Sequence, residues 1–161
     1  MKTELYINQK SIILRALGLA KKAILIAFVL TPIRFFLELA KLPERAIFIV
    51  GLLWLTLGFA IYWGIKLYNE KHAYLLLLLS LLIYSPISRF PVAVLWWIDT
   101  KWEIGTHYGF YFENFGQALL NQVGYGSLVQ IIPGFILGSI TIAIMSNRKG
   151  AIKKTNNLEN E

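Results

Sequence analysis

Residues 73–98 read AYLLLLLSLLIYSPISRFPVAVLWWI, and this stretch decides the fold class. A helix needs about 20 mostly apolar residues to cross about 30 Å of hydrocarbon, and this stretch carries one charge, Arg89, between Pro86 and Pro91. The whole chain is similar in character, because 57% of its 161 residues are hydrophobic and 16% are charged, against about 25% charged residues in soluble domains. We therefore predict an all-α integral membrane protein.

Four transmembrane helices are expected, because three further stretches are comparably apolar. The four predicted spans cover about residues 23–40, 46–66, 73–98 and 126–145. The first span contains Arg34 and Glu38 among eleven Leu, Ile, Phe and Val residues. Each of those apolar residues contributes about −0.3 to −0.6 kcal/mol to insertion, against about +2.5 to +3.5 kcal/mol for a central charge, and the balance favours a helix that inserts.

The chain divides into three parts on this interpretation: a cytoplasmic N-terminal segment 1–22, a transmembrane domain 23–146 and a basic, then polar, tail 147–161. In the N-terminal segment, Ile13, Leu14, Leu17 and Ala20 recur at helical spacing. This pattern predicts an amphipathic helix lying on the lipid surface. The alternative is a cytoplasmic extension of the first transmembrane helix.

The outer loop 99–125 is rich in aromatic residues, which collect at the depth of the lipid headgroups. Within it, residues 110–122 show two faces at helical spacing, with Glu113, Gln117 and Asn121 on the polar one. We predict a short extracytoplasmic surface helix that caps the outer ends of the spans.

Basic residues set the orientation, because cytoplasmic segments carry the excess of Lys and Arg. Lys41, Arg45 and Lys101 fall on one side of the predicted membrane, and Arg34 and Arg89 lie inside spans. The other side holds the remaining bases: Lys2, Lys10, Arg15, Lys21, Lys22, Lys66, Lys71, Arg148, Lys149, Lys153 and Lys154. We therefore expect a plasma-membrane protein, the inner membrane where there are two, with both termini in the cytoplasm. The net charge of +7 reflects this asymmetry, and no nucleic-acid partner is expected.

Charged residues inside spans are costly and mark candidate functional sites. At 1.5 Å per residue, Arg34 lies about 10 Å below Lys41, and Arg89 about 15 Å below Asp99. Two guanidinium groups at similar depth can bind a phosphate or carboxylate, with Glu38 as a balancing charge. The alternative is structural: Arg34 and Glu38 neutralise each other, and Arg89 bonds to carbonyls that proline leaves free.

Two further sets of polar residues are weaker candidates. Glu113 and Gln117, on the polar face of the expected surface helix, complete the predicted ligand site. Asp99, Glu103 and His107 follow one another at intervals of four residues, so a continuous helix would align them as ligands of a divalent metal. Gly105 and Thr106 interrupt that helix, and the alternative is a solvated loop.

Small residues four positions apart predict close helix packing. Ala60 and Gly64 form one such pair in the second span, and Gly134 and Gly138 form another in the fourth. Such pairs allow helix backbones to approach closely in lipid. They join either helices of one chain or those of a homo-oligomer or a larger membrane protein.

Function is the least determined property of the sequence. The chain has no cysteine, which excludes thiolate nucleophiles and cysteine-ligated metals, and no sequence motif indicates a cofactor. Our leading hypothesis is a non-enzymatic helical bundle acting as an accessory subunit or scaffold. The second is binding or transport of a small anion or lipid headgroup at an outer-leaflet site around Arg34 and Arg89. The third is a membrane-embedded enzyme, in which Glu38, Glu113 or His107 serves as acid or base.

Overall fold

The computed structural model describes residues 2–107 and 112–158. Helices make up 86% of the structure, and the described residues contain no strand. The all-α part of the predicted fold class is therefore confirmed.

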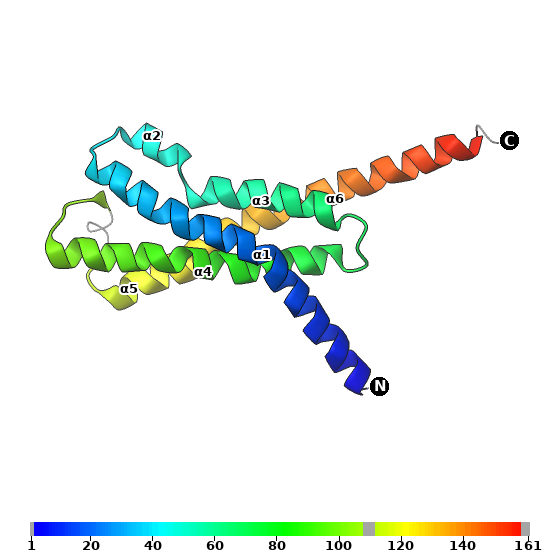
Figure 1. Ribbon diagram of the computed structural model, residues 1–161, viewed down its shortest axis with the longest axis horizontal. Helices are drawn as coiled ribbons and strands as arrows, with labels where there is room; N and C mark the ends of the chain where they lie inside the picture. Colours follow the sequence, from blue (N-terminus) through cyan, green and yellow to red (C-terminus); the bar gives the residue numbers. More distant parts are fainter. Residues whose placement is uncertain (1, 108–111, 159–161) are drawn as a thin grey trace.

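Four helices lie along one another in an elongated bundle (Figure 1). They are α1 (Lys2–Leu39), α3 (Leu52–Leu67), α4 (Ala73–Trp102) and α6 (Gly126–Leu158). The shorter elements are α2 (Glu44–Ile49), α5 (Phe115–Leu119) and the π-helix η2 (Leu120–Tyr125). Both chain ends and the connection from α3 to α4 lie at one end of the bundle, and α2 and α5 lie at the other (Figure 1).

Two helical stretches are long and apolar enough to cross a membrane by length and composition, Ala73–Trp102 and Phe115–Lys149. The first is α4 and the second joins α5, η2 and α6. Helix α3 is apolar but has only 16 residues, which spans about 24 Å at 1.5 Å per residue.

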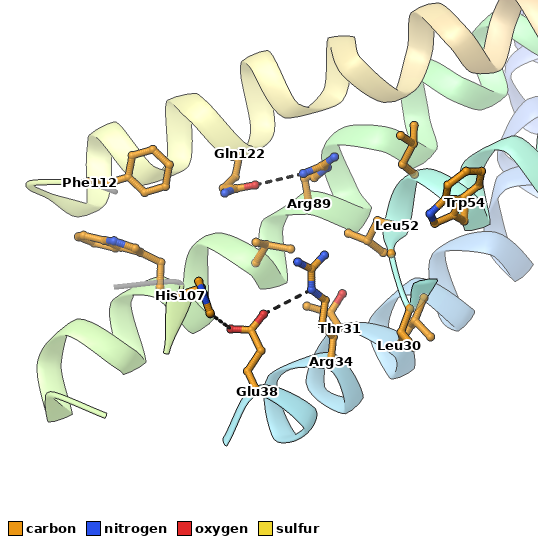
Figure 2. A pocket seen from close by; sticks show the side chains of 15 residues that line it. Leu30, Thr31, Arg34, Glu38, Leu52, Trp54, Arg89, His107, Phe112 and Gln122 are labelled. Carbon is orange, nitrogen blue, oxygen red and sulfur yellow. Dashed lines mark hydrogen bonds and ion pairs between the residues drawn. The ribbon is translucent and has the colours of Figure 1, made fainter. Parts of the chain in front are cut away.

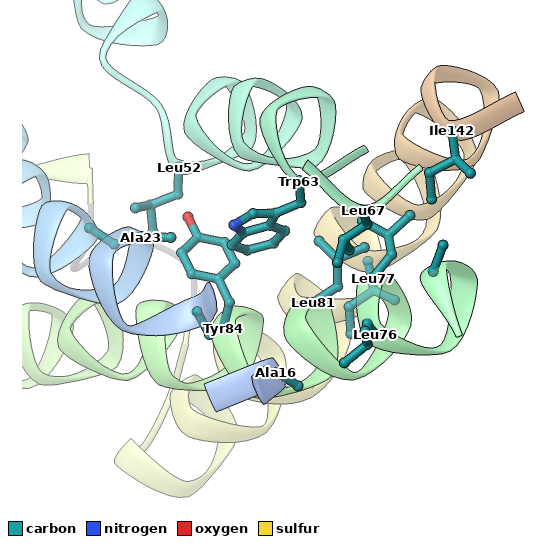
Figure 3. Close-up of a cluster of buried hydrophobic side chains, with 14 of the residues drawn as sticks. Ala16, Ala23, Leu52, Trp63, Leu67, Leu76, Leu77, Leu81, Tyr84 and Ile142 are labelled. Atoms are coloured by element: carbon teal, nitrogen blue, oxygen red, sulfur yellow. The ribbon is translucent and has the colours of Figure 1, made fainter. Parts of the chain in front are cut away.

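The core lies where α3, α4 and α6 meet (Figure 3). Its largest side chains are Trp63 of α3 and Tyr84 of α4, both fully buried, with ring centroids 6.1 Å apart in an edge-to-face arrangement. Leucines of α4 and Ile142 of α6 pack around them. Burial of this apolar surface holds the three helices together.

Helix α1 packs through alanines. Ala16, Ala20, Ala23 and Ala27 lie on one face of the helix and are fully buried. The hydroxyl of Ser80 on α4 is 3.4 Å from the carbonyl oxygen of Ala16. Because alanine side chains are short, α1 and α4 approach closely along this face.

The N-terminal segment differs from the predicted separate surface helix, because it continues into α1 without a break. Ile13, Leu14 and Leu17 remain between 43% and 59% exposed, whereas Ala16 and Ala20 are buried. The helix matches the alternative interpretation in that residues 2–22 extend the helix that contains residues 23–39. Ala20, one of the four residues of the predicted apolar face, is buried in the bundle, where small residues allow close approach.

The prediction of one uninterrupted helix over residues 46–66 was wrong. Helix α2 ends at Ile49, and α3 begins at Leu52 after Gly51 in an extended conformation, with φ −111° and ψ 143°. Hydropathy does not register such a break, since Val50 and Gly51 are as compatible with an apolar span as their neighbours. Glycine lowers the cost of leaving the helix there.

The predicted surface helix 110–122 also differs from the structure. Residues 108–111 lie outside the described residues, and the described helix begins at Phe115. From there α5, η2 and α6 follow one another along one direction (Figure 1). The segment is therefore the first part of the last long helix and not a separate cap.

The predicted small-residue pairs meet at the crossing of α3 and α6. A Cβ atom added to Gly64 would lie 2.8 Å from the carbonyl oxygen of Gly138, and one added to Gly138 would lie 3.0 Å from that of Ala60. At Gly134 an added Cβ would be 3.1 Å from a methyl group of Leu81. These residues are used in packing within the chain.

We expect Gly64→Ala to destabilise the bundle, because the new methyl group would meet a backbone atom that cannot rotate away. Overpacking of this kind costs about 1–3 kcal/mol, or about 2–12 °C in the unfolding temperature of a domain this size. The matched control is Gly58→Ala on the same helix, where nothing lies within 4 Å of the added Cβ. Helix propensity alone should leave the control unchanged or slightly stabilised. Equal unfolding temperatures for the two variants in detergent would contradict the packing described.

Candidate functional site

A cavity of about 250 Å³ lies at the end of the bundle that carries α2 and α5. Its walls come from the second half of α1, residues 50–54, the second half of α4, His107, Phe112 and Gln122 of η2. Segments far apart in sequence thus form one pocket (Figure 2). The predicted candidates Arg34, Glu38 and Arg89 all line it.

Two guanidinium groups reach the cavity from opposite walls, Arg34 from α1 and Arg89 from α4 (Figure 2). Arg34 Nε lies 3.5 Å from Glu38 Oε1, one helical turn away. Arg34 and Glu38 therefore form the predicted ion pair, and both residues line the cavity. Two guanidinium groups and one carboxylate leave one net positive charge.

Glu38 is the most enclosed charge of the site, since only 4% of its side chain is exposed. Its Oε2 lies 3.8 Å from Nδ1 of His107, which comes from the connection after α4. Oε2 has no hydrogen-bond partner among the described residues. An enclosed carboxylate oxygen of this kind favours a ligand that donates a hydrogen bond.

Arg89 is positioned by the last long helix. Its Nη1 donates to Oε1 of Gln122 at 3.3 Å. A Cβ atom added to Gly126 would lie 3.3 Å from the guanidinium carbon, so the absence of a side chain at Gly126 makes room for Arg89. Gln122 belongs to η2, and π-helical turns occur frequently at functional sites.

Two further groups favour an anion. Helix α3 begins at the cavity wall, where residues 51–54 line the pocket. The first N–H groups of a helix have no acceptor within it and carry the positive end of the helix dipole. The indole N–H of Trp96, a residue only 3% exposed, also lacks a hydrogen-bond partner among the described residues and belongs to the same lining.

Two predicted ligand residues lie outside the cavity. The side chain of Gln117 accepts a hydrogen bond from the backbone N–H of Glu113 at 2.8 Å, and both residues are exposed. Asn114 caps α5 by accepting from the N–H of Gln117. These polar side chains therefore organise the start of a helix.

The predicted metal ligands are not brought together. Asp99 is buried and accepts hydrogen bonds from the backbone N–H and the hydroxyl of Thr106, at 3.1 and 2.7 Å. Glu103 is exposed in the left-handed conformation that ends α4, and His107 approaches Glu38 instead. Among the described residues, no three His, Asp, Glu or Cys side chains are grouped so as to hold a metal ion.

Sequence reasoning missed Gln122, Trp96 and the start of α3, and it placed His107 in the wrong group. The polar pattern of residues 113–121 was read at the α-helical period, whereas residues 120–125 form a π-helix with a longer turn. Trp96 lies in the apolar stretch 73–98, where its position in the sequence does not indicate a donor to a ligand. Gly51, a glycine within an apolar stretch, is the sequence feature that could have indicated the start of α3.

Comparison of the chain with protein-family models, curated proteins and solved structures finds no match. The functional argument therefore depends on the chain's own residues. The strongest feature is the pocket, since it combines two arginines, an enclosed carboxylate and a helix N-terminus.

We expect Asp99→Ala to loosen the connection that brings His107 to Glu38. The change leaves the buried Thr106 N–H without its acceptor, which costs about 1–3 kcal/mol. Hydrogen exchange of the Thr106 amide should accelerate, and the unfolding temperature should fall. Glu103→Gln, at an exposed carboxylate nearby, is the control and should change neither. Unchanged exchange in the Asp99 variant would mean that Asp99 does not hold this connection.

Proposed function

We propose that the protein is a multi-pass membrane protein that binds an anionic group, a phosphate or a carboxylate, in the pocket between α1, α3 and α4. The observation that carries the proposal is the pair Arg34 and Arg89 on opposite walls of one cavity. Two like charges around a cavity repel each other unless a negative charge lies between them. Glu38 is the carboxylate among the described residues that line the cavity.

The composition of the pocket suits such a ligand. Arginine presents a planar array of donors that matches phosphate and carboxylate oxygens. The start of α3 adds backbone N–H groups, an arrangement that binds anions in many proteins. The break between α2 and α3 fits this function too, because irregular backbone at membrane depth is tolerated where it lines a cavity.

The exposed surface of the helices supports membrane insertion. Val129, Ile132, Ile136 and Ile140 of α6 are between 50% and 57% exposed. Leu25, Val29 and Phe36 of α1 are between 58% and 68% exposed. Contiguous apolar surface of this kind is costly in water and is satisfied by lipid. In the proposed arrangement, α1, α2 with α3, α4, and α5 with α6 provide the four crossings.

The proposed orientation places the termini and the α3–α4 connection in the cytoplasm. These segments carry most of the basic residues and lie at the same end of the bundle (Figure 1). On the cytoplasmic side, Arg15 pairs with Glu70, and Lys149 donates to Asn69. The pocket then opens in the outer half of the membrane.

The accessory-subunit and enzyme hypotheses stay predictions. The small-residue pairs that motivated a scaffold are packed within the chain at the α3–α6 crossing. Association with another membrane protein would therefore use a different surface, such as the exposed apolar side of α6.

The absence of native cysteine allows a direct test of the topology. We expect single cysteines replacing Leu42 and Ile104 to react with a membrane-impermeant maleimide in intact cells, because these exposed positions lie at the outer end. Cysteines replacing Lys71 and Asn147 should react only after permeabilisation. Labelling of Lys71→Cys in intact cells would overturn the four-crossing arrangement.

Removal of either guanidinium should weaken anion binding. We expect inorganic phosphate to raise the unfolding temperature of the detergent-purified protein relative to chloride at equal ionic strength, because a ligand of the folded state stabilises it. In Arg34→Gln and Arg89→Gln the phosphate affinity should fall about tenfold or more, since a charge-assisted hydrogen bond contributes about 1.5–3 kcal/mol.

Lys101→Gln is the matched control, because it removes one positive charge at the same end of the bundle, where Lys101 contacts the rings of Trp97 and Trp102. It should retain the phosphate response. An equal response in the control and in both arginine variants would contradict an anion site at this pocket.

A further inference from the structure

We infer that the anion bound in this pocket is the phosphate of a phospholipid whose headgroup carries a hydrogen-bond donor, as in phosphatidylethanolamine or phosphatidylglycerol. The inference rests on the proposed function and names the ligand class of the same site. It follows from the order of chemical groups along the pocket.

One end of the pocket is apolar, and the opposite end, called the polar end here, carries charged and polar groups beside the ring of Phe112 (Figure 2). Leu30, Leu52 and Trp54 form the apolar end, Arg34 and Arg89 lie in the middle, and Glu38 and His107 lie at the opposite end. In the proposed orientation, the polar end faces the outer surface and the apolar end faces the bilayer centre. An outer-leaflet phospholipid has the same order of groups, from headgroup through phosphate to acyl chains.

The phosphate would occupy the middle of the pocket. There it would lie between the two guanidinium groups. A phosphate diester keeps one negative charge, which equals the net positive charge of Arg34, Arg89 and Glu38 together. Trp96 offers an additional donor from α4, since its buried N–H has no partner among the described residues.

Glu38 determines which headgroup fits. Its Oε2 is enclosed and accepts no hydrogen bond within the described residues. The ammonium of ethanolamine or a hydroxyl of glycerol would donate to this oxygen. The quaternary ammonium of choline has no N–H or O–H hydrogen to donate, so phosphatidylcholine would give Oε2 no hydrogen bond.

The rim of the pocket suits entry from the bilayer. Trp54 is 51% exposed and Arg34 is 38% exposed at its side chain, although both line the cavity. Ile33 and Ile49, which neighbour lining residues, are 45% and 73% exposed. Exposed apolar side chains beside an accessible guanidinium match the boundary between acyl chains and headgroups.

The test compares lipids on the delipidated full-length protein by native mass spectrometry. The probes are phosphatidylethanolamine, phosphatidylglycerol and phosphatidylcholine with identical acyl chains, and inorganic phosphate as a competitor. We expect the first two lipids to bind about tenfold more tightly than phosphatidylcholine, the value of one charge-assisted hydrogen bond. Inorganic phosphate in millimolar excess should displace them only weakly, because it lacks the acyl chains.

Single substitutions test which residues cause the preference for phosphatidylethanolamine and phosphatidylglycerol over phosphatidylcholine. Glu38→Gln, which keeps the shape of the side chain and removes its charge, should lower the ratio of the affinities for the two donor-bearing lipids to the affinity for phosphatidylcholine, whatever its effect on binding of the phosphate. Arg89→Gln should weaken all three lipids, and Lys101→Gln should weaken none. The comparison of lipids on the unaltered protein needs no variant, so a misfolded variant does not remove the test.

The outcomes separate the two proposals. Phosphatidylcholine binding as tightly as the other lipids would overturn the headgroup assignment. Arginine-dependent binding of inorganic phosphate that lipids do not displace would overturn the lipid inference and keep the anion site. Lipid and phosphate binding that are both indifferent to Arg34 and Arg89 would overturn the proposed function itself.

Discussion

Close approach of helix backbones is the constraint on which the rest of the structure depends. Helices α3 and α6 touch at Gly64 and Gly138, where a single methyl group would collide with a backbone carbonyl. Helix α1 meets α4 through four fully buried alanines. At these crossings the small residues allow the close packing on which association of the helices depends. With α1, α3 and α6 held around α4, the ends of these helices enclose the pocket.

The pocket concentrates groups that are costly to bury. Arg34, Glu38 and Arg89 would each require a partner or water at membrane depth. Arg34 and Glu38 are partners of each other in an ion pair, and Gln122 accepts a hydrogen bond from Arg89. The remaining positive charge and the start of α3 are what make the site suitable for an anion. A purely structural role for the arginines accounts for the pairings but gives no reason for the cavity between them.

Part of the site could be predicted from the sequence, because a charged residue that is costly to place in a membrane stands out within an apolar stretch. An arginine or glutamate in an apolar stretch is costly to insert into a membrane wherever the helix packs, so the sequence alone predicts Arg34, Glu38 and Arg89 as site residues. Gln122, Trp96 and His107 carry no such signal. Their roles depend on a π-helical turn, on an indole N–H that has no hydrogen-bond partner among the described residues, and on a connection that Asp99 holds through Thr106. The polar face of Glu113 and Gln117 misled the prediction, because polar side chains at helix starts often serve the backbone.

The sequence by itself determined that the chain is helical and where its apolar stretches lie. It also determined which small residues allow close packing and which charged residues fall within apolar stretches. These are properties of composition and local period, and each is readable over one or two helical turns. Only the tertiary structure decided that the second apolar stretch breaks at Gly51 and that the N-terminal segment continues into α1. It also decided that His107 lies near Glu38 and that Gln122 accepts from Arg89. Those outcomes depend on contacts between residues far apart in the chain. Such contacts are selected by the packing of whole helices, which no local pattern contains.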